Sequence, residues 1–237
     1  MNTSRTQFFR APLTPSGAVR QPVFNPSLLA ADFACLKREI RALEQAGAEV
    51  LHLDIMDGHF APNLSFGVPV VEAVRKTTDL PLDVHLMLSN PEDFLVPFRK
   101  AGADCLTIHI EAVPDPTRLL DEIHKLGAGA GLAVNPPTDI VVLEPYLELC
   151  DLVLTMSVMP GFGGQKFNPV ALDKLSWLRK NAPDRVWRSV DGGVNESTIR
   201  SCVEAGANLL VMGTAILGHP SYRDRFEFLR DKIASRQ

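Results

Sequence analysis

The chain has 237 residues, 46% of them hydrophobic, and its 24 Lys and Arg against 28 Asp and Glu give a net charge of −4 at pH 7. It therefore lacks the basic excess typical of proteins that bind nucleic acid or anionic lipid, and its length suits one α/β-barrel domain rather than two full domains. Four widely spaced cysteines without a CxxC pair argue against a disulfide framework and against a zinc ribbon.

The N-terminal segment, residues 1–22, contains three arginines and three prolines but no acidic residue. We expect a disordered or loosely docked arm here, in preference to an organellar targeting sequence, and we place the folded domain at residues 23–237. No apolar run is long enough to span a membrane, and the N-terminus lacks the apolar core of a signal peptide. The prediction is therefore a cytoplasmic protein that binds neither membranes nor nucleic acid.

A short motif, Ala-Gly-Ala, recurs at residues 46–48, 101–103 and 205–207. Each copy ends a helical pattern and precedes an apolar run, as expected of a glycine that terminates a helix in the left-handed conformation before a strand. The three glycines are 55 and 104 residues apart. These separations equal about two and four units of roughly 26 residues, the size of one βα unit in a barrel.

The remaining apolar runs complete the alternation of strands and helices. Strands are predicted at 23–28, 50–55, 82–88, 105–110, 129–134, 152–156, 186–190 and 209–212. Helices are predicted at 32–46, 68–77, 91–101, 116–126, 138–147, 169–180, 197–205 and 220–234. Strict alternation predicts parallel strands, and eight units predict a single-domain α/β fold, the (β/α)8 TIM barrel. The alternative, an open doubly wound sheet, would typically carry a GxGxxG turn after its first strand, which this chain lacks.

Polar residues at alternate positions mark the strand ends, where barrels place their active sites. His52 and Asp54 share the inward face of the second strand, His85 faces inward on the third, and Asp191 lies at the end of the seventh. Each alone could be a hydrogen-bonded core residue. Together, two buried carboxylates beside two imidazoles favour one divalent metal ion, Zn²⁺, Fe²⁺, Mn²⁺ or Co²⁺. His109 and Glu111 also face inward, without a pattern that assigns them a role.

Glycine-rich loops follow the last three strands, at residues 159–165, 191–193 and 213–214. Barrels often bind phosphate with backbone N–H groups of these loops, so the combination predicts a phosphate-binding cradle. Ordinary turns are the alternative interpretation.

Five motifs now resemble, in order and spacing, the ribulose-phosphate 3-epimerase family: PSLLAADF, LHLDIMDGHFAPN, DVHLM, SVMPGFGGQKF and VDGGV. The resemblance covers the chain from about residue 23. It implies a metal-dependent (β/α)8 enzyme that interconverts D-ribulose 5-phosphate and D-xylulose 5-phosphate by epimerisation at C3, through a metal-stabilised 2,3-enediolate. It also implies that His52, Asp54, His85 and Asp191 bind the metal, and that Asp54 and Asp191 form the acid/base pair.

The resemblance further implies contacts with a phosphosugar substrate, and methionines around its reacting carbons. The implied substrate-binding residues are Ser27, His85, Gly161, Phe162, Gly163, Gly164, Asp191, Gly192, Gly193, Gly213 and Thr214. The implied methionines are Met56, Met87 and Met156. We also expect a homo-oligomer.

Some positions depart from the family pattern. Ser189 replaces the usual Glu before VDGG, Met159 replaces the usual Asn or Glu before PGFGG, and Ala30 and Thr214 each replace a Ser. These changes keep two alternatives open: an epimerase for another ketose phosphate, such as D-allulose 6-phosphate, and a noncatalytic phosphate-binding barrel. A Schiff-base aldolase would need an inward lysine at a strand end, which the predicted strands lack.

Overall fold

The computed structural model describes residues 3–10 and 21–234. Its centre is one eight-stranded parallel sheet, in the order β1-β8-β7-β6-β5-β4-β3-β2. A parallel bridge between Ser27 and His52 joins β1 to β2, so the sheet closes into a barrel. The strands are β1 Val23–Pro26, β2 Leu51–Met56, β3 Leu82–Met87, β4 Cys105–His109, β5 Gly129–Val134, β6 Leu152–Met156, β7 Trp187–Asp191 and β8 Leu209–Met212. All eight predicted strands are confirmed, with ends that differ by two residues or fewer.

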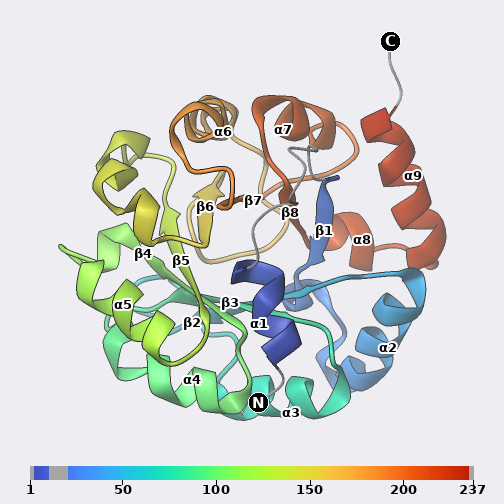
Figure 1. Cartoon of the computed structure of the whole chain (residues 1–237). Coiled ribbons are helices and arrows are strands. Elements are labelled where there is room, and N and C mark those ends of the chain that lie inside the picture. Colours follow the sequence, from blue (N-terminus) through green and yellow to red (C-terminus); the bar gives the residue numbers. More distant parts are fainter. Residues whose placement is uncertain (1–2, 11–20, 235–237) are drawn as a thin grey trace.

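Most of the α-helices lie around the ring of strands (Figure 1). The α-helices of the described residues are α1 Thr3–Arg10, α2 Leu36–Ala46, α3 Val68–Thr77, α4 Leu95–Ala101, α5 Thr117–Lys125, α6 Val170–Asn181, α7 Ile199–Ala205, α8 Thr214–Leu217 and α9 Tyr222–Ala234. Within residues 3–10 and 21–234, five segments are 3-10 helices: η1 Leu28–Ala30, η2 Phe33–Cys35, η3 Pro91–Asp93, η4 Ile110–Ala112 and η5 Ile140–Leu149. The (β/α)8 prediction is therefore confirmed. No helix in the described part of the chain is long and apolar enough to cross a membrane.

Three predicted helices differ in type, wholly or in part, from those observed. The segment predicted as a helix at 138–147 is the 3-10 helix η5, which contains Pro145. Proline has no backbone N–H and its ring clashes with the preceding turn of an α-helix, so a regular α-helix is disfavoured here. The predicted helix at 32–46 is divided into η2 and α2, and the one at 91–101 into η3 and α4.

The repeated glycines act as predicted. Gly47, Gly102 and Gly206 end α2, α4 and α7 with φ of 93°, 117° and 119°, and each donates its N–H to carbonyls of the last helical turn. At Gly102 a Cβ would lie 2.4 Å from Cγ of Arg75. The position therefore requires glycine both for its left-handed backbone and for the close packing of α3.

The two largest clusters of buried hydrophobic residues in the described part of the chain stabilise the barrel. The larger lies between the strands and the surrounding helices, and includes Leu53, Leu86 and Leu106. The smaller fills the barrel interior and includes Leu154, Met156 and Trp187. Because successive strand residues face opposite sides, the apolar residues that alternate with His52, Asp54 and His85 belong to the larger core.

Helix α1 lies across the centre of the ring of strands (Figure 1) and closes one end of the barrel. Phe9 is 1% exposed. It packs so closely on β5 that a Cβ added at Gly129 would lie 2.8 Å from the Cβ of Phe9. The Phe8 ring stacks on Trp187 at 4.9 Å, and Trp187 Nε1 donates to the Phe8 carbonyl at 3.1 Å. Arg5 pairs with Asp79 at 3.0 Å.

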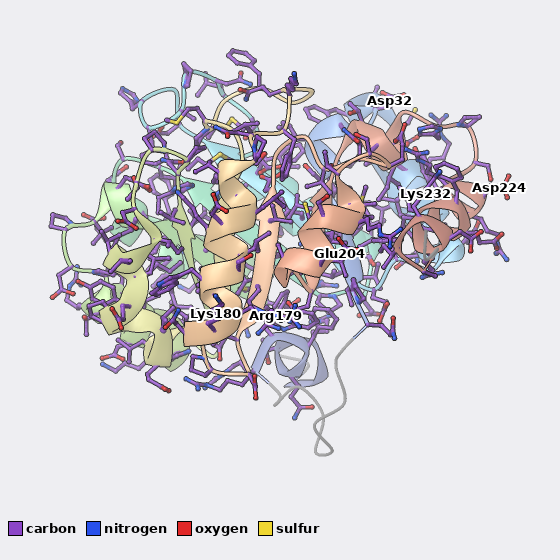
Figure 2. All side chains as sticks on the ribbon, turned by 90° about the horizontal axis from the view of Figure 1, so that it is seen from above. Asp32, Arg179, Lys180, Glu204, Asp224 and Lys232 are labelled. Carbon is purple, nitrogen blue, oxygen red and sulfur yellow. The ribbon has the colours of Figure 1, made fainter. Side chains whose placement is uncertain are left out.

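Residues 3–10 therefore differ from the disordered or loosely docked arm that we predicted, because burial of aromatic side chains in the barrel holds the helix in place. Residues 11–20 of that segment lie outside the described residues. Figure 2 shows α1 beside Arg179 and Lys180, whereas Asp32, which follows β1, lies at the opposite end of the barrel. The two ends of the barrel thus have different roles, and the polar strand ends are at the end that α1 leaves open.

Replacing Phe9 tests the contribution of this helix to stability. We expect Phe9→Ala to lower the free energy of unfolding by about 3 kcal/mol, because the substitution removes a buried ring and leaves a cavity. Denaturant unfolding followed by tryptophan emission would measure this change. Phe228→Ala, at a ring that is 41% exposed, is the control and should change stability by about 1 kcal/mol or less. Equal effects of the two substitutions would show that α1 contributes little.

Candidate metal centre

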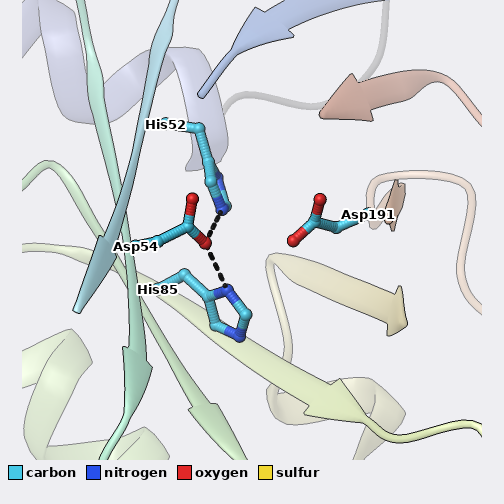
Figure 3. Close-up of side chains that lie close together, drawn as sticks. All are labelled: His52, Asp54, His85 and Asp191. Carbon is cyan, nitrogen blue, oxygen red and sulfur yellow. Dashed lines mark hydrogen bonds and ion pairs between the residues drawn. The ribbon is translucent and has the colours of Figure 1, made fainter. Parts of the chain in front are cut away.

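Two imidazoles and two carboxylates meet at the open end of the barrel (Figure 3). His52 and Asp54 come from β2, His85 from β3, and Asp191 is the last residue of β7. The two imidazoles are fully buried, Asp54 is 3% exposed, and Asp191 is partly buried. One potential ligand atom from each residue lies within 4.8 Å of the others. The structure therefore brings together all four residues that strand alternation selected.

Asp54 is at the centre of the cluster. Its Oδ1 lies 3.2 Å from His52 Nε2 and 3.2 Å from His85 Nδ1, while its Oδ2 accepts a hydrogen bond from Ser27 Oγ at 2.6 Å. Asp191 faces this group from the other side, without a direct bond to the three residues (Figure 3). The gap between them is bordered by nitrogen and oxygen atoms.

The surroundings of the two carboxyl groups move their pKa values in opposite directions. Burial by itself would raise the pKa of Asp54, but the His52 and His85 imidazoles hold it far below its usual range. Burial, and then the negative charge of Asp54, raise the pKa of Asp191 to about 7. Burial would lower the pKa of His52, but Asp54 and Asp83 raise it well above its usual value. Near neutral pH the metal-free site thus has one firmly ionised carboxylate and one that readily holds a proton.

The donor atoms suit a divalent transition metal. Imidazole nitrogen and carboxylate oxygen are the ligands of Zn²⁺, Fe²⁺, Mn²⁺ and Co²⁺ sites, and a divalent cation would offset the repulsion between Asp54 and Asp191. The four residues could therefore bind a metal ion.

A pocket of about 630 Å³ opens above the cluster. Asp54 and Asp191 line it, together with the sulfur-bearing side chains of Met56, Met87 and Met156. Of the residues predicted to contact substrate, His85 lies outside the lining and the others line the pocket: Ser27, Gly161, Phe162, Gly163, Gly164, Asp191, Gly192, Gly193, Gly213 and Thr214. The three glycine-rich loops thus border one cavity.

The glycine at 193 is required by the packing of two of these loops. Gly193 has a φ of 62°, and a Cβ there would lie 2.5 Å from the backbone nitrogen of Phe167, in the segment that follows β6. The loop after β6 is stabilised by its own hydrogen bonds, because Gln165 Nε2 donates to the carbonyls of Met159 and Phe162, both at 2.9 Å. Asn63 Nδ2 donates to the Gly161 carbonyl at 2.7 Å and links this loop to the one after β2. The loops form a defined rim around the pocket.

Sequence reasoning missed the residues behind the histidines. Asp83 Oδ2 lies 2.8 Å from His52 Nδ1, and His109 Nε2 lies 2.8 Å from His85 Nε2. Burial lowers the pKa of His109 to about 4. Strand alternation indicated that His109 faces inward, but no spacing rule pairs residues that are 24 and 31 positions apart. Ser189, the departure beside Asp191, is fully buried and adds no charge to this group.

The barrel and its site define the class of this protein as a (β/α)8-barrel enzyme. Residues 23–217 match the model of the ribulose-phosphate 3-epimerase family. A ribulose-phosphate 3-epimerase of Bacillus subtilis (strain 168) is 46% identical over 209 residues, which cover 86% of this chain and 96% of that protein. The chloroplastic ribulose-5-phosphate-3-epimerase of Arabidopsis thaliana is 43% identical over 213 residues, which cover 88% of this chain and 76% of that protein. The chain belongs to the ribulose-phosphate 3-epimerase family.

Among solved structures, a mutant tryptophan synthase α-subunit (E103A) from Pyrococcus furiosus resembles the chain with a TM-score of 0.65 and 17% identity. The similarity covers 91% of this chain and 98% of that one, and it reflects the barrel fold.

The raised pKa of Asp191 predicts a pH-dependent stability of the metal-free protein. A carboxyl group whose folded-state pKa is raised contributes stability below its unfolded pKa, and loses it as pH rises toward the folded value of about 7. The Asp191→Asn variant does not lose stability in this way, because its amide does not ionise. In the presence of a chelator, the free energy of unfolding of the variant relative to that of the original protein should therefore increase by on the order of 2 kcal/mol from pH 5 to pH 8. This is less than the full shift in pKa would give, because the Asp191 side chain is partly exposed.

Thermal unfolding of both proteins at the two pH values would measure this gain. A stability difference that is the same at pH 5 and pH 8 would contradict the raised pKa. Asp173→Asn, at an exposed position on α6, is the control and should show no pH-dependent gain.

Proposed function

We propose that this protein epimerises D-ribulose 5-phosphate and D-xylulose 5-phosphate at C3, with Asp54 and Asp191 as the acid/base pair. The observation that carries the proposal is the placement of these two carboxyl groups on facing sides of one pocket, with opposite tendencies to hold a proton. The family to which the chain belongs supports the choice of reaction.

Inversion beside a ketone requires removal of a carbon-bound proton on one face and return of a proton on the other. In one direction Asp54, which is ionised, accepts the proton from C3, and Asp191, which readily holds a proton, donates from the opposite side. The roles exchange in the reverse direction. A divalent cation held by His52, Asp54, His85 and Asp191 would supply positive charge where negative charge develops on the substrate oxygens.

The rest of the pocket suits a phosphosugar. The backbone of Gly192, Gly193 and Gly213 and the N-terminal turn of α8 would bind the phosphate, while the loop at Gly161, Phe162, Gly163 and Gly164 would cover the sugar. Met56, Met87 and Met156 line the pocket with apolar, polarisable groups that do not exchange protons with the two carboxyl groups. Ser27 holds Asp54 in place through its hydrogen bond, and His85, whose Nδ1 lies 3.2 Å from Asp54 Oδ1, would help to hold the metal. We place the catalytic domain at residues 23–237.

Turnover assays on ribulose 5-phosphate and allulose 6-phosphate would test the choice of substrate. We expect conversion of the five-carbon sugar to be faster, and a preference of more than about tenfold for the six-carbon sugar would overturn that choice, a difference of about 1.4 kcal/mol in transition-state binding. Metal-loaded protein should also incorporate solvent deuterium at C3 of the substrate. If neither sugar acquires deuterium, the noncatalytic phosphate-binding barrel is favoured. The native metal, the homo-oligomeric state and the cytoplasmic location stay predictions.

A further inference from the structure

Two hydrogen-bond chains lead away from the imidazoles on the side opposite Asp54. We propose that Asp83 and the pair His109 and Glu111 are positioning residues, which fix His52 and His85 in opposite tautomers so that His52 presents Nε2 and His85 presents Nδ1 to the metal. This inference rests on the proposed function only in taking these histidines as metal ligands.

The first chain begins at His52. Its Nε2 points to Asp54 at 3.2 Å and its Nδ1 lies 2.8 Å from Asp83 Oδ2. The same oxygen accepts a hydrogen bond from Asn25 Nδ2 at 2.7 Å, and Asp83 is 1% exposed. Because this oxygen already accepts a hydrogen bond from Asn25, it is an acceptor toward His52 as well, so Nδ1 must carry the hydrogen. The lone pair available to a metal is therefore on Nε2, and Asn25 keeps Asp83 in position.

The second chain begins at His85. Its Nδ1 lies 3.2 Å from Asp54 Oδ1, and its Nε2 lies 2.8 Å from His109 Nε2. Two ring nitrogens at this distance share one hydrogen, so one ring must donate and the other accept. The geometry of the pair alone does not decide which.

Glu111 decides the direction of that bond. Its Oε2 lies 3.1 Å from His109 Nδ1, which therefore donates to the carboxylate, while Oε1 accepts from the backbone N–H of Asn135 at 2.7 Å. In a neutral His109 ring the other nitrogen, Nε2, is then an acceptor. His85 must donate from its Nε2, which leaves the lone pair on Nδ1 facing Asp54 and Asp191.

The two histidines thus present different ring atoms because their supports come from different strands. Asp83 lies on β3 beside β2, whereas His109 lies at the end of β4 and Glu111 in η4. A hydrogen bond to the far nitrogen both orients an imidazole ligand and raises its basicity. Loss of either support should weaken metal binding even though no ligand is removed.

Metal affinity and tautomers measure this role without an activity assay. We expect Asp83→Leu and His109→Leu, which remove the hydrogen-bond acceptor, to weaken Zn²⁺ binding by about 10- to 100-fold in competition with a chromophoric chelator. His109→Gln should bind Zn²⁺ within about threefold of the original protein, because an amide oxygen can still accept from His85 Nε2. His124→Gln is the matched control, since His124 makes a similar 2.8 Å bond to Asp151 away from the pocket and should leave affinity unchanged.

Nitrogen-15 NMR of the zinc-loaded original protein tests the assignment directly and needs no variant. It should show a hydrogen on Nδ1 of His52 and on Nε2 of His85. The same tautomer at both histidines, or equal zinc affinity of His109→Leu and His109→Gln, would overturn the proposal. Neither measurement depends on turnover, so the proposed tautomers can be confirmed or refuted even if the epimerase assay shows no activity.

Discussion

The Asp191→Asn variant will lose epimerase turnover by about three orders of magnitude while retaining its fold. The amide is nearly the same size as the carboxyl group, but it neither donates nor accepts a proton at C3, and positioned acid/base groups contribute roughly 10²- to 10⁴-fold to rate. Steady-state kinetics on metal-reconstituted protein would measure the loss. Metal content must be determined in parallel, because Asp191 is also a candidate ligand.

A second measurement separates loss of one acid/base group from general damage. Asp54 remains in Asp191→Asn, so the variant should still exchange the C3 proton of one epimer with solvent deuterium while interconversion is blocked. Asp173→Asn, on the exposed face of α6, is the control and should keep normal turnover. Near-normal interconversion by Asp191→Asn would contradict the two-carboxylate mechanism.

Removal of bound metal is the other large effect that we expect. Chelation should reduce turnover by at least about 10³-fold, because the charge that develops on the substrate oxygens would then lack its counter-charge in a site that already contains Asp54 and Asp191. It should also lower the thermal unfolding midpoint, since two neighbouring carboxyl groups lose the cation that relieves their repulsion.

Reconstitution distinguishes metals and supplies the control. Adding Zn²⁺, Fe²⁺, Mn²⁺ or Co²⁺ should restore turnover, and the most effective ion would identify the preferred metal. Mg²⁺ should restore it poorly, because that ion favours oxygen ligands and retains its water. Full activity in protein without detectable metal would show that the four residues act without a cation.

Much of the fold was predictable because its signals are local. Strand alternation has a period of two residues, so His52 and Asp54 were predicted to share the inward face of β2. The structure confirms this, since the intervening Leu51, Leu53 and Ile55 lie in the core beneath the helices. The glycines at helix ends were equally predictable, because their left-handed conformation depends on the adjacent turn.

The segments that differ from prediction depend on contacts or on competing local effects. The apolar pattern at 138–147 indicated a helix, but Pro145 favours the 3-10 form. The docking of helix α1 was not predicted, because Phe8 and Phe9 contact Trp187 and Gly129, which lie more than a hundred residues away in the chain. The short helix α8 was also missed, because four residues carry too little periodicity to be recognised.

The sequence by itself determined the barrel, the inward direction of His52, Asp54 and His85, and the family. Only the tertiary structure decided how these groups differ from one another. Two imidazoles hold the pKa of Asp54 far below its usual range, burial and then the charge of Asp54 raise the pKa of Asp191 to about 7, and the histidines have different hydrogen-bonded supports. These differences arise from distances between strands that are far apart in the chain. A pattern of residue types contains no such distances, whereas charge interactions and hydrogen bonds depend on them directly.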